Sequence, residues 1–131
     1  MFRRNSMRNN RSGFTLIELL IVVVIVGILA LAAIPLITSN TRDARRAEGE
    51  QLMGSARDYC RVEYSKNGNA TAVTTPFGTQ VTNGAFAGKY YAVNTYTAGT
   101  PSVTATATSS SDGNGLMSWA WASGNSTISW P

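Results

Sequence analysis

A single carboxylate, Glu18, interrupts an otherwise apolar run near the start of this 131-residue chain. The surrounding stretch reads RSGFTLIELLIVVV, and every other side chain from residue 16 to residue 24 is apolar. Moving a lone carboxylate from water into an apolar environment costs several kcal/mol. A carboxylate in this position is therefore expected to meet a cation.

Other reactive side chains are few. The chain has no histidine and one cysteine, Cys60, so a His-based triad, a zinc-binding cysteine cluster and an internal disulfide are all excluded. The sequence shows no nucleophile and base pair and no phosphate-binding loop, and we expect a protein that is not an enzyme. Cys60 falls on the apolar face of a predicted helix, which predicts a buried, inert thiol.

The positive charge is concentrated at the N-terminus. The formal net charge is +4, four arginines precede Gly13, and the rest of the chain carries seven basic and seven acidic residues. Phosphate binding needs clustered positive charge. Nucleic acid is therefore not favoured as a partner once the leader is removed.

Composition divides the chain into four segments. Residues 1–13 form a leader rich in Arg, Asn and Ser, and residues 14–39 form an apolar helix. The 24 residues from Phe14 to Ile37 would reach roughly 36 Å as a helix, enough to cross a hydrocarbon core of about 30 Å. Residues 40–66 are predicted to continue this helix in amphipathic form, and residues 67–131 to hold a connecting loop and a β-sheet.

Alternating segments after residue 70 predict the sheet. KYYAVNTYT, SVTATAT, LMSWAWA and TISW each alternate apolar and polar side chains, and turn residues at 112–115 and 124–125 separate the last three. A connecting loop of about 20 residues, containing Pro76, Gly78 and Gly84, is expected before them. The expected fold class is α+β, with one long N-terminal helix packed on a C-terminal antiparallel sheet of three or four strands.

The stretch RSGFTLIELL resembles the processing site of type IV prepilins and of the related type II secretion pseudopilins. The resemblance rests on basic residues followed by Gly13, Phe14, Thr15 and Glu18 at the start of an apolar helix. It implies the pilin fold and a structural subunit of a helical homopolymer. Its implied partners are a prepilin peptidase, the membrane before assembly, and the inner-membrane machinery of pilus or secretion assembly.

The resemblance further implies that the peptidase cuts after Gly13 and methylates the new amino group of Phe14. An α-amine has a pKa of about 8, so it is cationic at neutral pH, and Glu18 lies one helical turn further on. Within one subunit the two charges partly neutralise each other; in a polymer, Glu18 can pair with the Phe14 amine of a neighbour. Such pairing rewards correct axial register, because an unpaired buried charge is costly. Thr15 is expected to be only a helix-compatible neighbour.

Gly27 and Pro35 interrupt the apolar helix. Pro35 has no N–H, so the helix is expected to kink or loosen near it. Such defects are common in membrane helices. Related filaments partly unwind this region, and the resemblance therefore implies that residues 27–35 lengthen when a subunit leaves the membrane.

Two features of the sheet region suggest ligands. Asp112 and Asn114 are candidates for a calcium site, as a loop of the major pseudopilins provides, but one carboxylate is few for an ion that takes about six to eight oxygens. We therefore expect no cofactor. Three tryptophans, Trp119, Trp121 and Trp130, could line a carbohydrate surface, whereas the spacing of Trp119 and Trp121 favours packing on the long helix.

The sequence leaves several functions open. The first is a type IV pilus-like filament subunit, inserted in the bacterial inner membrane with a cytoplasmic N-terminus and later part of an extracellular filament. The second is a major pseudopilin of a periplasmic type II secretion piston. A membrane-tethered binding module that does not polymerise is the third. In many pilins a disulfide joins the C-terminal sheet to the loop that precedes it. This chain has one cysteine, Cys60, and cannot form that bond.

Overall fold

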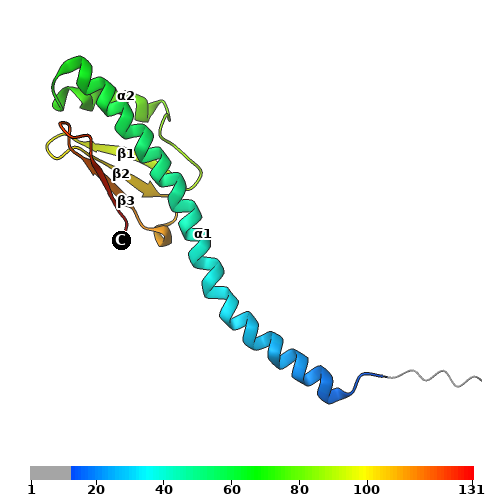
Figure 1. Cartoon of the computed structure of the whole chain (residues 1–131). Coiled ribbons are helices and arrows are strands. Elements are labelled where there is room, and N and C mark those ends of the chain that lie inside the picture. Colours follow the sequence, from blue (N-terminus) through cyan, green and yellow to red (C-terminus); the bar gives the residue numbers. More distant parts are fainter. Residues whose placement is uncertain (1–12) are drawn as a thin grey trace, which may run out of the picture. The chain divides into compact units, whose positions relative to one another are not determined.

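A computed structural model describes residues 13–131, and residues 1–12, including the arginines of the predicted leader, lie outside the described part. The chain divides into two compact units, one ending at Thr38 and one running from Ser39 to Pro131. The order of elements is a long helix, a short helical connection and four strands (Figure 1). The predicted α+β class, a long helix with an antiparallel sheet, is confirmed.

Helix α1 runs from Leu16 to Asn67 without interruption. It ends one residue beyond the predicted end at residue 66, and Gly68 has φ 65°, a left-handed conformation that glycine adopts at low cost. The amide of Gly68 donates to the carbonyl of Tyr64 at 2.7 Å, which closes the last turn.

The prediction of an irregular connecting loop was wrong. A short 3-10 helix, Thr71–Val73, leads directly into helix α2, Thr74–Thr82, which includes both Pro76 and Gly78. Pro76 is tolerated because it lies in the first turn, where its missing N–H has no intrahelical partner to lose. Phe77 and Val81, four residues apart, place one face of α2 against the core.

Four antiparallel strands follow in the spatial order β1-β2-β3-β4. Their bounds are Tyr91–Thr97, Ser102–Ala107, Gly115–Trp119 and Ser126–Ser129. All four predicted alternating segments therefore form strands. A short 3-10 helix, Ser110–Asp112, lies between β2 and β3.

The core of the second unit lies between α1 and one face of the sheet. From α1 it receives Met53, Ala56 and Cys60, all with no exposed surface, and from the sheet Tyr91, Val93, Val103, Ala105, Met117 and Trp119. Phe77 of α2 stacks on Phe86 with ring centroids 5.3 Å apart. The sheet is thus apolar on its inner face and rich in Ser and Thr on the other.

The tryptophans pack against the core. Trp119 is buried, and Trp121, just beyond β3, stacks on Tyr64 of α1 with centroids 4.2 Å apart. Trp130 contacts Tyr91 edge on. The packing interpretation of Trp119 and Trp121 is therefore confirmed, and Trp130 also faces the helix side of the sheet.

Burial raises the pKa of the Cys60 thiol from 9.0 to about 12. Above about pH 9 the unfolded chain ionises at this thiol and the folded chain does not, so this contribution to stability is lost as the pH rises toward 12. We predict that Cys60→Ala makes the fall in stability between pH 9 and 11 shallower, by at most about 1.4 kcal/mol per pH unit.

Denaturant unfolding of both proteins at a series of pH values measures this difference. Burial also raises the pKa of Tyr96 to about 12. The stability of Cys60→Ala should therefore still decrease with pH, and this pH dependence should become weaker again in a double variant with Tyr96→Phe. Parallel curves for wild type and Cys60→Ala would contradict the prediction.

Candidate processing and assembly site

The predicted cleavage position lies just before α1. Gly13, Phe14 and Thr15 are outside the helix, and Phe14 is 87% exposed. Apart from its chain neighbours, no described residue has an atom within 4 Å of the position that a Cβ on Gly13 would take. An exposed, non-helical peptide bond is the kind that a peptidase can bind and cut.

Thr15 and Glu18 form a reciprocal cap at the start of α1. The amide and the hydroxyl of Thr15 donate to Oε2 of Glu18 at 3.3 and 3.1 Å, and the amide of Glu18 donates to Oγ1 of Thr15 at 3.4 Å. This is a capping box, which satisfies donors that the helix itself leaves unpaired. A carboxylate in the first turn is also stabilised by the helix dipole.

The cap changes the interpretation of two residues. Thr15, which the sequence reasoning left without a role, is the N-cap of α1, and the order Thr-x-x-Glu before an apolar run is the signal that would have found it. Glu18 is not an isolated carboxylate within its own chain. Any pairing of Glu18 with a neighbouring amine must add to, or compete with, its hydrogen bonds to Thr15.

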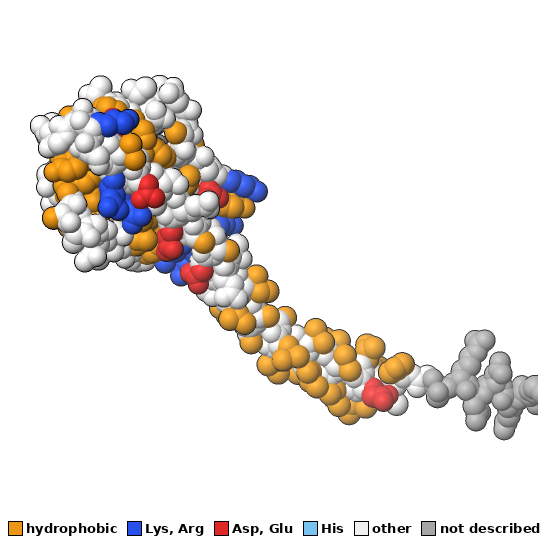
Figure 2. Space-filling view, turned by 45° about the horizontal axis from the view of Figure 1, so that its top comes forward, with side chains coloured by type: hydrophobic (Ala, Val, Ile, Leu, Met, Phe, Trp, Pro, Cys, Tyr) orange, Lys and Arg blue, Asp and Glu red, His pale blue; other side chains and the backbone are white. Residues whose placement is uncertain are grey.

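The apolar run of α1 is exposed along its length. Its large side chains are from 52% exposed at Ile21 to 85% exposed at Leu16, and hydrophobic side chains cover this segment in the view of Figure 2. By length and composition, α1 is the one helix of the described chain that could cross a membrane. An apolar surface of this extent needs cover by lipid or protein.

Gly27 and Pro35 lie within this exposed run. Helix α1 continues through both, and the hydroxyl of Thr38 donates to the carbonyls of Ile34 and Pro35 at 2.8 and 3.1 Å. Pro35 cannot donate to the carbonyl of Leu31. The lengthening of residues 27–35 is a change between two states and stays a prediction.

Asp112 and Asn114, the candidate calcium ligands, both have partners within the chain. Arg45 Nη1 lies 3.4 and 3.1 Å from the two carboxylate oxygens of Asp112, and the amide of Ala107 donates to Oδ1 of Asn114 at 3.0 Å. Across residues 13–131, no cluster of three or more His, Cys, Asp or Glu could hold a metal ion. An arginine thus occupies the place of a cation beside Asp112.

Comparison with known families identifies the N-terminal part of the chain. Residues 8–34 match the family described as the prokaryotic N-terminal methylation motif. No solved structure was found to match the chain. The chain therefore carries the prepilin signature of type IV pilins and pseudopilins, on an α+β architecture of the pilin kind.

The match confirms the predicted resemblance to type IV prepilins and pseudopilins at the N-terminus. The motif and the apolar helix fit a membrane-anchored precursor that a prepilin peptidase processes. Proteins with this motif are structural rather than enzymatic. The matched residues include Gly13, Phe14 and Glu18.

We predict that Thr15→Ala frays the start of α1, whereas Thr15→Ser leaves it intact. Loss of the N-cap hydroxyl costs about 1 kcal/mol, and serine provides the same acceptor. Hydrogen exchange at the Glu18 amide, measured in detergent micelles, should accelerate in Thr15→Ala. Equal exchange in the wild type and both variants would show that the cap contributes nothing.

We also predict that calcium does not change the stability of the second unit, Ser39–Pro131, here named the head. Because Arg45 already pairs with Asp112, the melting temperature should be the same in excess EDTA and in excess calcium chloride. Asp112→Asn should lower the melting temperature equally in both, since it leaves the guanidinium without its counter-charge. A melting temperature that rises with calcium would overturn this assignment.

Proposed function

We propose that this chain is a structural subunit of a type IV pilus-like filament. It is made as a bacterial inner-membrane precursor with a cytoplasmic N-terminus, cut after Gly13 by prepilin peptidase and methylated on Phe14. The methylation motif at residues 8–34 supports this processing. The exposed peptide bond before Phe14 is compatible with it.

One observation carries the proposal: the processing motif leads into an apolar helix surface that is exposed among the described residues 13–131. The membrane covers that surface before assembly. After extraction, the equivalent helices of neighbouring subunits replace the lipid and form the core of a helical homopolymer. Burial of apolar surface contributes about 25 cal/mol per Å², so this helix is the main source of polymer stability.

Glu18 gives the polymer its register. The processed Phe14 amine of one subunit is the cation that the Glu18 carboxylate of its neighbour meets. A subunit displaced along the axis leaves both charges without a partner in an apolar core, which is strongly unfavourable. The pairing therefore selects one arrangement more than it adds net stability.

The alternative is a pseudopilin of a type II secretion piston, whose processing motif is the same. The Arg45–Asp112 pair supports the pilus, because Asp112, the candidate calcium ligand of a major pseudopilin, is paired with an arginine of α1 instead. Surface fibres containing this chain would support the pilus, and a strictly periplasmic polymer would support the piston. A monomer with a retained leader would instead indicate a membrane-tethered binding module.

Replacement of Glu18 tests the proposal. We predict that Glu18→Ala and Glu18→Gln are both processed normally but enter fibres about tenfold less or worse, a change equivalent to 1.4 kcal/mol. Glutamine keeps an acceptor for the cap but has no charge, so similar losses in both variants assign the effect to charge. Thr15→Ala, which removes the cap and keeps the carboxylate, is the matched control.

Two measurements read the outcome. Mass spectrometry of the N-terminus should show a chain that begins at Phe14 with one added methyl group, in the wild type and all variants. Immunoblots of sheared fibres give the incorporated fraction. An intact Met1 in the assembled wild type would refute the proposed processing, and unchanged fibre yield in Glu18→Ala would refute the role of Glu18.

A further inference from the structure

Three chain segments meet at one end of the sheet. The register pairs Tyr91 with Ala107, Ala105 with Gly115, and Leu116 with Ser129. The start of β1, the connection from β2 to β3 and the end of β4 therefore lie at the same end. One turn of α1, residues 45–50, contacts all three segments and is here named the clamp turn.

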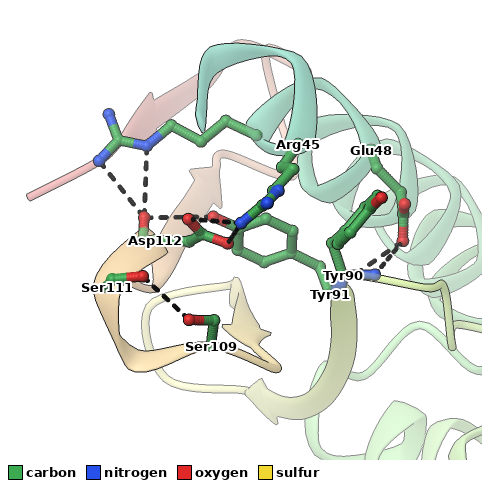
Figure 3. A network of polar contacts seen from close by, with 8 residues as sticks. Arg45, Glu48, Tyr90, Tyr91, Ser109, Ser111 and Asp112 are labelled. Atoms are coloured by element: carbon green, nitrogen blue, oxygen red, sulfur yellow. Dashed lines mark hydrogen bonds and ion pairs between the residues drawn. The ribbon is translucent and has the colours of Figure 1, made fainter. Parts of the chain in front are cut away.

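Glu48 of the clamp turn holds the start of β1. Its Oε1 accepts hydrogen bonds from the backbone amides of Tyr90 and Tyr91 at 3.0 and 3.4 Å (Figure 3). The carboxylate lies so close to Gly88 that a Cβ there would collide with it. Glu48 thus binds the backbone just before β1 and at its first residue. Apolar packing of side chains alone would not fix the position of these amides.

The two arginines of the clamp turn hold the connection between β2 and β3. Arg45 pairs with the carboxylate of Asp112, whose side chain is 5% exposed, and its guanidinium also lies over the ring of Tyr90. Arg46 donates to the backbone carbonyl of Asp112 from Nε and Nη2, at 3.4 and 3.5 Å. The hydroxyl of Tyr91 donates to the same carbonyl at 3.2 Å (Figure 3).

Trp130, just after β4, completes the contacts. Its indole N–H donates to Oε1 of Glu50 at 3.0 Å, and the guanidinium of Arg46 lies 5.2 Å from the centroid of its ring. Arg46 also donates to the carbonyl of Pro131 at 3.2 Å. The segment after β4 is therefore fixed to α1 by two hydrogen bonds and one cation–π contact.

Glycines mark this end of the sheet as closely packed. Among all glycines of residues 13–131, only four would bring an added Cβ within 3.0 Å of another residue, and all four lie here: Gly49, Gly88, Gly113 and Gly115. The Cβ positions of Gly49 and Gly115 would lie 2.9 and 2.6 Å from the Trp130 ring. A side chain at either position would push the indole away.

We propose that the clamp turn replaces the disulfide that a chain with one cysteine cannot form. It ties β1, the 110–113 connection and the β4 end to α1, and it determines which part of the head opens first. When the clamp fails, β4 and Trp130 separate from α1 while the core around Cys60 stays closed.

The consequence for a polymer rests on the proposed filament function. Tension on a filament enters each head through α1, and the clamp turn lies near the start of the part of α1 that belongs to the second unit. The clamp would therefore keep the edge strand β4 paired under load. Exposed, released strands are prone to pair with other chains.

A matched pair of glycine substitutions in α1 tests the clamp in the full chain in detergent micelles. Gly49→Ala crowds Trp130 and Tyr91, whereas the added methyl of Gly54→Ala meets nothing within 4 Å. Both gain the same helix propensity. We expect Gly54→Ala to raise the melting temperature and Gly49→Ala to lower it; the reverse order, or equal increases, would overturn the proposal.

Hydrogen exchange and thiol labelling then separate local opening from general unfolding. Gly49→Ala should speed exchange of the β4 amides by about tenfold or more, while labelling of Cys60 stays as slow as in the wild type. Cys60 is fully buried and ten residues beyond Glu50, about 15 Å along the helix. Trp130→Phe, which keeps an aromatic ring but removes the donor to Glu50, should give a smaller effect of the same kind.

Two outcomes would refute the clamp. Unchanged β4 exchange in both variants would show that these contacts do not hold the strand. A parallel rise in β4 exchange and Cys60 labelling would show that the head opens only as a whole. Neither readout depends on fibre formation, so failure here is distinguishable from failure of the Glu18 experiment.

Discussion

A carboxylate at the beginning of an apolar helix must have a partner in every state that the chain occupies. In the single chain, the partner of Glu18 is Thr15, whose amide and hydroxyl both donate to it. In a filament core, hydrogen bonds alone leave a net negative charge in an apolar medium. The proposed amine of a neighbouring Phe14 neutralises it, and the capped helix start holds Glu18 in a defined conformation before that neighbour arrives.

The charge of the sheet region also has a partner within its own chain. From Tyr90 to Pro131 the only charged residue is Asp112, and it lies buried against Arg45. The charged side chains that hold this end of the sheet belong to α1, within residues 45–50. Further along α1, Arg57 donates to the hydroxyl of Ser126 at the start of β4. One helix thus carries two kinds of contact surface. One is an exposed apolar run, and the other is a polar turn that binds the head of its own chain.

Sequence reasoning could predict the parts of this structure that depend on periodicity. The strands and the burial of Cys60 follow from alternation and helical spacing, because one side chain every two or every three to four residues faces the core. It predicted a loop in place of α2, because Pro76 and Gly78 are typical of loops when the first-turn position of the proline is not considered. The clamp turn could not be predicted, because contacts such as Arg45 with Asp112 join residues 67 positions apart.

A high-resolution map of the native polymer tests the proposed pairing of Glu18. The terminal nitrogen of Phe14 in one subunit should lie within about 4 Å of the Glu18 carboxylate of a neighbour, the limit for an ion pair. A map in which that carboxylate faces only apolar side chains and its own Thr15 would contradict it.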